Sequence, residues 1–271
     1  MTSLLPSFSS SRRQGGRTLF VGVDVCLMSL SRIEGMRRQL CELLGLEDEL
    51  LVTSTIHSHS CPNGLRDDSL IDHDTPGYAD LVTGLVVQAA SKLPDGLVEV
   101  TPQILATHVR GWYSNRNSIE KPFDDEAFVI RFVDAGGKVV AAMQNFNCHS
   151  TVVGPTNMLI TSDLQGAVRA ELAEWLGVVP YAFTGASGDL GTGSSDRQRL
   201  AELKRVSCGI AAELMKGSFE PCIWMRPLRG SSSIGWTTIT RSIFPATEHS
   251  SLRRRRCFRT RGPRPTRASL L

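Results

Sequence analysis

Along residues 17–220, segments in which apolar positions form short continuous runs alternate with segments in which they recur every three or four residues. Short apolar runs rich in β-branched residues predict strands, and apolar positions three and four residues apart predict amphipathic helices. The predicted strands are 20–27, 50–56, 98–109, 127–133, 139–147 and 178–183, and the predicted helices are 32–44, 78–93, 163–175 and 196–216. This alternation indicates an α/β fold, in which a mixed β-sheet flanked by helices forms a single domain.

Local signals mark the ends of several predicted elements. Ser31 and Glu34 form a capping box at the start of the first helix. Asp163 is placed to cap the third helix, and a glycine-containing turn at 134–137 joins the strands on either side of it into a hairpin. The buried face of the second helix is predicted to carry Leu81, Leu85, Val86 and Ala89.

Net charge divides the chain into unequal parts. Residues 1–16 are rich in Ser, Arg and Gly and predict a loose N-terminal end, and the α/β domain occupies 17–220. Residues 221–271 hold 11 arginines, no lysine and one acidic residue, a net charge of +10, whereas residues 1–220 carry −7. We expect this basic tail to be disordered, and its composition resembles out-of-frame sequence joined to a domain fragment.

Overall composition excludes several classes of protein. Apolar residues make up 41% of the 271 positions, so the chain can bury a core, and no apolar run approaches the length of a membrane-spanning helix. The first residues lack the basic and apolar regions of a signal peptide, which favours a cytoplasmic protein. The seven cysteines include no CxxC pair, so neither a disulfide framework nor a cysteine zinc site is indicated.

Histidines stand at the ends of two predicted strands. His57 and His59 are separated by one residue at the end of a strand, so their side chains would project from the same face. His149 ends the apolar strand 139–147 in a similar position. Imidazole is a preferred zinc ligand, so two such strand ends predict a shared metal site. Taken singly, each histidine is better explained as an ordinary polar or hydrogen-bonded residue at a strand end.

Two further motifs are candidates for chemistry. Arg116 lies in an Asn-Arg-Asn loop, where a guanidinium could bind a carbonyl or stabilise an oxyanion, or simply be solvated. The glycine-rich stretch 185–191 follows a strand and predicts a tight functional turn. It matches neither a dinucleotide-binding motif nor a P-loop, which argues against nucleotide binding.

The order of these motifs resembles one family. Ser-Thr-Ile-His-Ser-His-Ser-Cys-Pro is followed by Asn-Arg-Asn, then Asn-Phe-Asn-Cys-His-Ser-Thr, Ile-Thr-Ser-Asp-Leu-Gln-Gly and Gly-Ala-Ser-Gly-Asp-Leu. This order, across residues 17–218, resembles the N-terminal catalytic domain of the neutral/alkaline non-lysosomal ceramidases and especially their shorter bacterial relatives. Members of the family are zinc amidases that cleave the N-acyl bond of ceramide.

The resemblance implies a role for each candidate residue. His57 and His149 would be zinc ligands, His59 would lie beside them or touch the substrate, and Arg116 would contact the reacting group. The implied substrate is a lipid or small-molecule amide, and no specific nucleic-acid partner is expected.

The sequence also departs from the family pattern. Gly191 stands where the ceramidases have a nucleophilic serine, and no residue in 221–271 matches the Glu and Tyr that complete the family's zinc site. A strand that usually precedes residue 17 is expected to be missing. We therefore expect a truncated form with little or no activity.

Two other functions compete with this one. Eight arginines between 253 and 267 are compatible with a non-catalytic binding protein whose tail contacts nucleic acid or an anionic membrane. A different metallohydrolase could also use the His-x-His step, as amidohydrolase barrels do. One domain with a hairpin does not fit an eightfold barrel.

Overall fold

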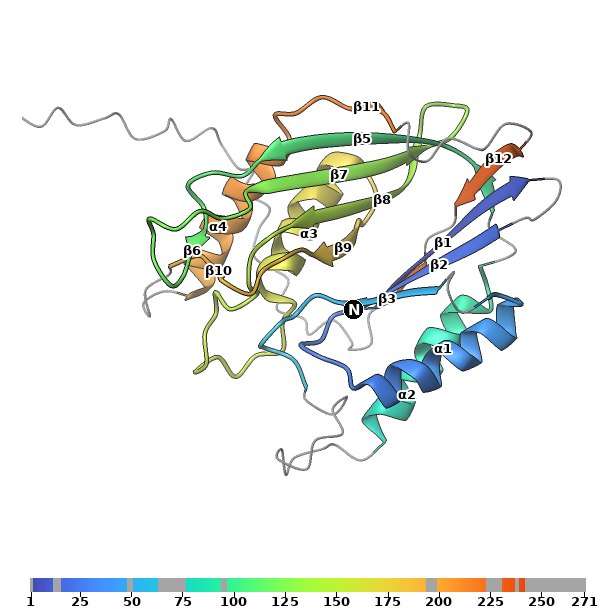
Figure 1. Cartoon of the computed structure of the whole chain (residues 1–271), viewed down its shortest axis with the longest axis horizontal. Helices are drawn as coiled ribbons and strands as arrows, with labels where there is room; N and C mark the ends of the chain where they lie inside the picture. The colour runs from blue at the N-terminus through green and yellow to red at the C-terminus, as the bar shows by residue number, and fades with distance from the viewer. Residues whose placement is uncertain are drawn as a thin grey trace, which may run out of the picture.

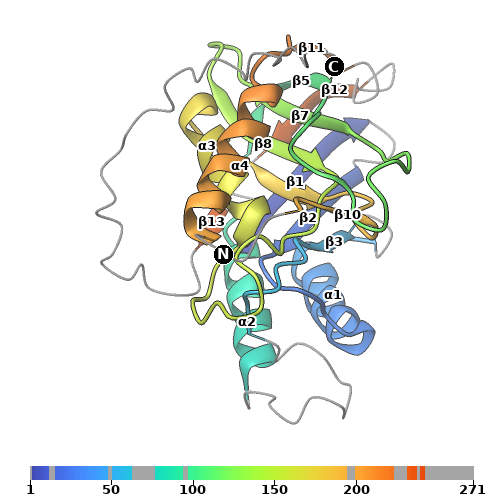
Figure 2. The same cartoon turned by 90° about the vertical axis from the view of Figure 1, so that its left-hand side faces the viewer.

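The chain forms four layers in the order helices, sheet, sheet, helices (Figure 1, Figure 2). The computed structural model describes residues 2–11, 16–47, 51–62, 77–93, 97–193, 199–222, 231–236 and 239–241. Within these ranges the predicted α/β class with a mixed sheet flanked by helices is confirmed, and the strands divide between two mixed sheets and one short pair.

Each of the two larger sheets combines parallel and antiparallel pairs. The first sheet has the order β3 (Leu51–Thr55), β2 (Gly16–Val23), β1 (Thr2–Ser11), β12 (Ser231–Trp236) and β4 (Val98–Glu99), with β13 (Ile239–Arg241) also on β1. The second has the order β11 (Glu220–Pro221), β5 (Thr101–His108), β7 (Glu126–Val133), β8 (Val139–Phe146) and β9 (Tyr181–Thr184). β6 (Ser114–Asn115) and β10 (Leu190–Gly191) form a separate short pair. The β2–β3 and β8–β9 pairs are parallel.

Three apolar clusters lie between the four layers. α1 (Leu30–Leu44) and α2 (Tyr78–Ala90) pack on the first sheet, and α3 (Asp163–Leu176) and α4 (Arg199–Leu214) pack on the second. The central cluster joins the two sheets through buried residues of β7, β8 and β9 and partly buried phenylalanines. Its members include Phe132, Ala141, Met143, Tyr181, Phe20 and Phe183.

The structure confirms some local predictions and corrects others. β7 and β8 form the predicted antiparallel hairpin. α1 begins at Leu30 after Ser29, whose side chain makes no capping hydrogen bond, so the predicted capping box is wrong.

In α2, Val82 is fully buried and Leu81 is 54% exposed, so the buried face is rotated from the predicted one. Burial of Tyr78 and Ala79 explains the rotation, because these residues extend the apolar face at its first turn.

Both ends of the chain contribute strands. Residues 2–11 form β1 rather than a loose end, and β1 pairs antiparallel with β2 from Thr2↔Val23 to Ser9↔Gly16. A strand is therefore present before residue 17. It escaped prediction because it is rich in serine, and it is stabilised by backbone pairing with β2 on one side and β12 on the other.

The basic tail is described in part. Residues 231–236 and 239–241 form β12 and β13, which pair with β1. The arginines between 253 and 267, and with them the tail's predicted contacts with nucleic acid or membrane, lie outside the described residues.

A buried ion pair links the first sheet to the helix layer behind the second. Asp24 follows β2 and Arg169 lies on α3, and their side chains are 3% and 4% exposed. Arg169 donates to both carboxylate oxygens of Asp24, with an Nη1–Oδ1 distance of 3.0 Å, and the Ser162 hydroxyl donates to Oδ2 at 2.6 Å. The pair thereby fixes the end of β2 relative to α3.

Gly22 lies where β2 of the first sheet packs against Tyr181 of the second, and it provides a test of their packing. A Cβ atom at Gly22 would lie 2.7 Å from Cε2 of the fully buried Tyr181 ring. We expect Gly22→Ala to lower the free energy of unfolding by about 1–3 kcal/mol, measured by urea denaturation. Gly84→Ala in α2 is the control, because its Cβ meets no atom within 4 Å and should raise stability by about 0.5–1 kcal/mol. Equal stability of Gly22→Ala and wild type would contradict this packing.

Replacing Arg169 tests the ion pair. Arg169→Met leaves the Asp24 carboxylate buried without its cation, and we expect a loss of about 3–5 kcal/mol in the free energy of unfolding. The double variant Asp24→Leu/Arg169→Met removes both charges and should recover much of that loss. Lys204→Met removes a pair in which the lysine is 60% exposed, and it should cost about 1 kcal/mol or less. A double variant that is less stable than Arg169→Met would contradict the prediction.

Candidate functional site

The predicted site residues meet at one edge of the fold. His57 and His59 follow β3, and His149 follows β8. A parallel bridge joins Ser58 to Ser150, and the His59 N–H donates to the Ser150 carbonyl at 3.2 Å. The two strand ends from different sheets are thus held side by side, and the three histidines that they carry are brought together.

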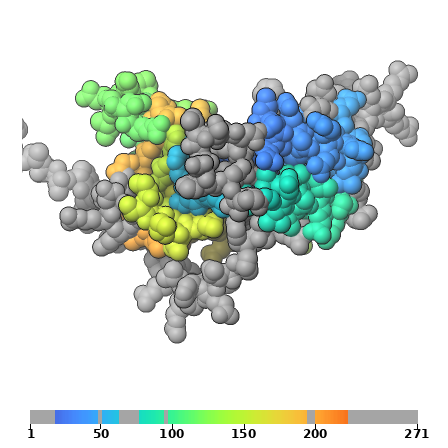
Figure 3. Space-filling view, turned by 90° about the horizontal axis from the view of Figure 1, so that it is seen from below, coloured from blue at the N-terminus to red at the C-terminus, as the bar shows by residue number. Residues whose placement is uncertain are grey.

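The loop between β8 and α3 covers the segment that follows β3. The Thr161 N–H donates to the Ser60 carbonyl at 2.8 Å, and the Ser58 hydroxyl donates to the Thr161 carbonyl at 2.7 Å. Figure 3 shows the face of the molecule on which this loop, in yellow-green, lies against the segment 51–62, in light blue. The loop therefore borders the histidines.

The three imidazoles form a compact cluster. The ring centroids of His57 and His59 are 4.9 Å apart, as are those of His57 and His149, and the His59–His149 separation is 5.8 Å. The Nε2 atoms of His57 and His59 are 3.4 Å apart. Such a group of nitrogen donors can bind a divalent metal ion.

Two of the three rings are oriented by backbone carbonyls. Nδ1 of His57 donates to the Cys26 carbonyl at 3.1 Å, and Nδ1 of His149 donates to the Ser187 carbonyl. A metal-binding histidine commonly uses its other nitrogen in this way, which leaves Nε2 for the ion. His57 also has a φ of 56°, a backbone conformation that is rare for residues other than glycine and is often found at functional sites.

The glycine-rich turn 185–191 positions both His149 and Arg116. It supplies the Ser187 carbonyl to His149, and its Asp189 carbonyl accepts the Arg116 N–H at 2.7 Å. The Asp189 carboxylate also accepts a hydrogen bond from the Asn115 amide at 2.6 Å. The turn thus acts by orienting neighbouring residues.

Burial and nearby positive charge favour the neutral forms of His59 and His149. Burial lowers the pKa of His59, and the neighbouring His57, His149 and Arg116 lower it further. Burial also lowers the pKa of His149; Arg116 and His57 add to the effect, and the hydrogen bond to Ser187 opposes it. Neutral imidazoles at pH 7 are competent metal ligands. Because the exposed Arg116 lowers the pKa of both His59 and His149, its positive charge contributes to the electrostatics of this cluster.

Cys26 lies beside the histidines, although the sequence did not predict it as a site residue. Its sulfur lies 3.7 Å from Nδ1 of His57, and Cys26, His57 and His59 each offer a donor atom within 4.8 Å of the others. The available signal was the position of Cys26 just after β2, because β2 and β3 are parallel and end at the same edge. A search for cysteine pairs could not find it.

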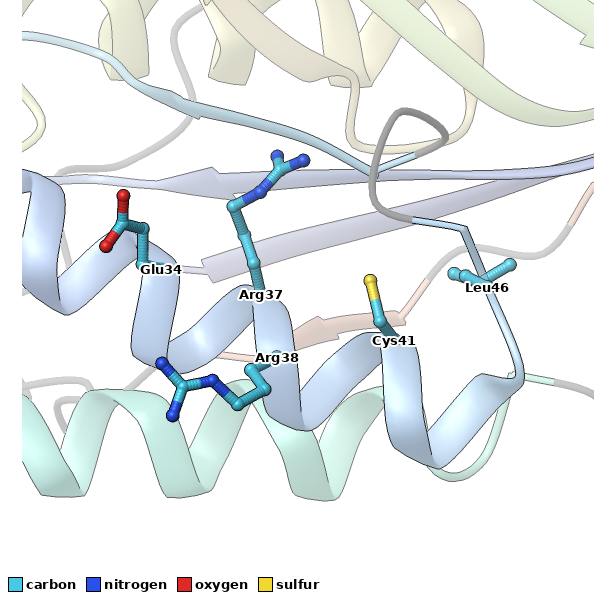
Figure 4. A pocket seen from close by; sticks show the side chains of 5 residues that line it. All are labelled: Glu34, Arg37, Arg38, Cys41 and Leu46. Carbon is cyan, nitrogen blue, oxygen red and sulfur yellow. The ribbon is translucent and has the colours of Figure 1, made fainter.

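A separate hollow lies beside α1 (Figure 4). It is lined by Glu34, Arg37, Arg38, Cys41 and Leu46. Arg37 points from α1 toward the first sheet and donates to the Leu51 carbonyl. This hollow contains none of the predicted site residues.

Asp163 holds the loop that follows His149, rather than capping α3 as predicted. Its carboxylate oxygens accept the N–H groups of Val152 at 3.2 Å and Val153 at 3.3 Å. Asp163 itself has a φ of 45° and is 1% exposed. The side chain therefore reaches back across the loop from the start of the helix.

Asp163 also predicts a pH dependence of stability. Burial raises its pKa to about 6, above the value near 3.9 of an unfolded chain. The folded state therefore binds more protons between pH 4 and 6, so the contribution of Asp163 is fully present below pH 4 and is lost as the pH rises through 6. As the pH rises from 4 to 7, the wild type loses this contribution and Asp163→Asn does not. The free energy of unfolding of the variant should therefore rise by on the order of 2–3 kcal/mol relative to that of the wild type. A wild-type/variant difference that is constant with pH would refute this.

Comparisons with known proteins agree with the motif order. No family model matches the sequence. Neutral ceramidase 1 of Arabidopsis thaliana is 25% identical over 190 residues, which cover 62% of this chain and 24% of that protein. The neutral ceramidase of Oryza sativa subsp. japonica is 26% identical over 188 residues, with 62% and 24% coverage, and that of Drosophila melanogaster is 23% identical over 184 residues, with 59% and 25%.

The fold is also similar to a solved structure. The neutral ceramidase from Pseudomonas aeruginosa superposes with a TM-score of 0.63 at 18% identity, covering 79% of this chain and 38% of that chain. At this identity the likeness concerns the fold. The chain spans about a quarter of the length of the curated relatives that it matches. In sequence this chain is similar to the neutral ceramidases over part of their length, and its fold is similar to that of the neutral ceramidase from Pseudomonas aeruginosa.

Proposed function

We propose that this chain is a zinc-dependent hydrolase of the ceramidase type, which cleaves the N-acyl amide bond of a lipid-like substrate. His57 and His149 hold the metal ion. The observation that carries the proposal is the convergence of three imidazoles and Arg116 at one edge of the fold, each imidazole arriving from a strand end. Similarity to the neutral ceramidases over 62% of the chain supports the class of reaction.

The side chains at this edge fit a zinc ion. Neutral imidazole is a preferred zinc ligand, and His57 and His149 both have Nδ1 on a backbone carbonyl, so that Nε2 is available. His59 has no such hydrogen bond at Nδ1 among the described residues and is exposed. We therefore assign His57 and His149 as ligands and place His59 beside them, in contact with the substrate.

Each residue has a defined task in the reaction. A bound zinc ion would supply Lewis acidity that polarises the amide carbonyl. Arg116 supplies a permanent positive charge beside the cluster, where it stabilises the negative charge that develops on the carbonyl oxygen. His59 is neutral at pH 7 because its pKa is lowered, so its imidazole can accept a proton at the substrate.

Gly191 indicates that water is the attacking group. It lies next to Arg116, because a Cβ built on Gly191 would be 3.6 Å from the Arg116 Cβ. The serine that the family resemblance places at this position would be beside the cation, and glycine offers no hydroxyl there. Hydrolysis by this chain therefore proceeds without a covalent intermediate at this position.

An exposed apolar segment favours a substrate with an acyl chain. Met158, Leu159 and Ile160 are 93%, 62% and 59% exposed, and they lie on the loop that borders the histidines. Such a contiguous apolar stretch is typical of a surface that contacts a lipid or another partner. None of the described helices is long and apolar enough to cross a bilayer.

Metal analysis and hydrolysis test this proposal together. We expect about one zinc ion per purified wild-type chain, and slow release of fatty acid from a short-chain ceramide. Without one of its two imidazole ligands the ion is lost, so His57→Ala and His149→Ala should lack both the zinc and the hydrolysis.

His108→Ala is the matched control for these variants. His108 lies on β5, is exposed and pairs with Asp125, and it is not one of the clustered histidines, so its removal should leave both zinc and hydrolysis unchanged. A wild-type chain without zinc would refute the metal assignment. Equal zinc in all variants would do the same, and zinc-loaded protein that hydrolyses no N-acyl amide would refute the reaction.

A further inference from the structure

Two cysteines from different segments of the chain meet beside His57. Cys26 follows β2, and Cys61 lies two residues after His59 in the segment that follows β3. The Cys26 N–H donates to Sγ of Cys61 at 3.0 Å, and both residues are partly buried. They are 35 residues apart in sequence and meet because β2 and β3 are parallel and end at the same edge.

The sulfur of Cys61 lies within reach of the Cys26 side chain. Because an N–Cα bond is about 1.5 Å long, the 3.0 Å contact with the backbone nitrogen places this sulfur at most about 4.5 Å from the Cys26 Cα atom. A cysteine sulfur lies about 2.8 Å from its own Cα atom, and a disulfide joins two sulfurs at about 2.05 Å. Rotation of the Cys26 side chain about its Cα–Cβ bond is therefore compatible with an S–S bond between the two residues.

The cysteine pair lies on the side of His57 that a metal ion would not use. Sγ of Cys26 is 3.7 Å from Nδ1 of His57, and this nitrogen donates to the Cys26 carbonyl at 3.1 Å. An ion held through Nε2 would be on the other side of the ring, so the ion and the two sulfurs do not compete for one nitrogen. An inference about the pair therefore does not require the proposed function.

We propose that Cys26 and Cys61 form a reversible redox pair, which hydrogen peroxide converts into a disulfide that ties the end of β2 to the segment carrying His57 and His59. Peroxide oxidises one thiol to a sulfenic acid and is itself reduced to water. The other thiol then attacks the sulfenic sulfur, and the displaced hydroxyl group leaves as a second water with the remaining thiol proton. A dithiol reductant reverses the reaction by thiol–disulfide exchange.

Disulfide formation changes the contacts of the segment that carries the histidines. Burial raises the pKa of the Cys61 thiol to about 11, so at pH 7 it keeps its proton and donates to the Ser58 carbonyl at 3.0 Å. A disulfide has no S–H group, so this carbonyl, which lies between His57 and His59, loses that donor. The same bond closes residues 26–61 into a loop, which stabilises the folded chain. The oxidation state of the pair is thus transmitted to the backbone of the two histidines.

Peptide mapping of the oxidised chain tests this pairing. The purified full chain is reduced, treated with a small excess of hydrogen peroxide, alkylated, digested with trypsin without reductant and analysed by mass spectrometry. Trypsin leaves Cys26 in peptide 18–32 and Cys61 in peptide 39–66, and we expect these two peptides to be joined. The thermal midpoint of unfolding should rise by about 5 °C or more on oxidation, and dithiothreitol should restore the lower value.

Cys41→Ser is the matched control, because Cys41 lies in the same tryptic peptide as Cys61 and is also partly buried. The joined peptides should persist in Cys41→Ser and be absent from Cys26→Ser and Cys61→Ser, whose midpoints should not rise on oxidation. Wild-type peptides that stay separate, a link that survives in Cys61→Ser, or a link found only between two chains would overturn the pairing. An unchanged midpoint in oxidised, linked wild type would overturn the stabilising role of the bond.

Discussion

The buried ion pair between Asp24 and Arg169 is the constraint on which the arrangement of the site depends. Two charges this deeply buried are tolerated only when they meet in good geometry, because the cost of removing each from water is several kcal/mol. The end of β2 and the register of α3 must therefore be correct together. The same contact fixes Ser162 at the start of α3 and, two residues beyond Asp24, the backbone of Cys26.

The site consists of strand ends whose positions are set relative to this ion pair. β3 is parallel to β2, so the segment with His57 leaves on the side of Asp24, and the bridge from Ser58 to Ser150 brings in the end of β8. No single sheet supplies the cluster. The central apolar layer, where Tyr181 packs against Gly22, keeps the two sheets close enough for their loops to meet.

Much of the fold was predictable because periodicity reports burial directly. The hairpin of β7 and β8 and the four helices follow from apolar spacing, whereas β1 is serine-rich and is held by backbone pairing that a side-chain pattern does not record. Leu81 was assigned to the wrong face of α2 because Tyr78 and Ala79 shift the buried stripe at its start. The starts of helices were harder to predict. The Asp163 carboxylate, for example, accepts hydrogen bonds from the loop after His149 instead of capping α3.

The site was predictable where a residue type and a strand end coincide. His57 and His149 satisfy both conditions, so the sequence predicts that they share one site. Cys26 satisfies the second condition, but its partners come from other segments and no short spacing reveals them. The turn at 185–191 needs glycine for packing, since a Cβ at Gly185 would lie 1.6 Å from Oδ1 of Asn147, and sequence alone cannot separate this need from anion binding.

Gly191 has a consequence for how chemistry can change within this fold. A side chain there would point into ordinary contact with Arg116, at 3.6 Å between Cβ atoms, and the backbone needs no glycine conformation. The position is therefore sterically permissive, and its occupant is not dictated by folding. A single codon change at this position can exchange a hydroxymethyl group for a hydrogen without disturbing the fold, so the mode of attack on a substrate can diverge while the architecture is inherited unchanged.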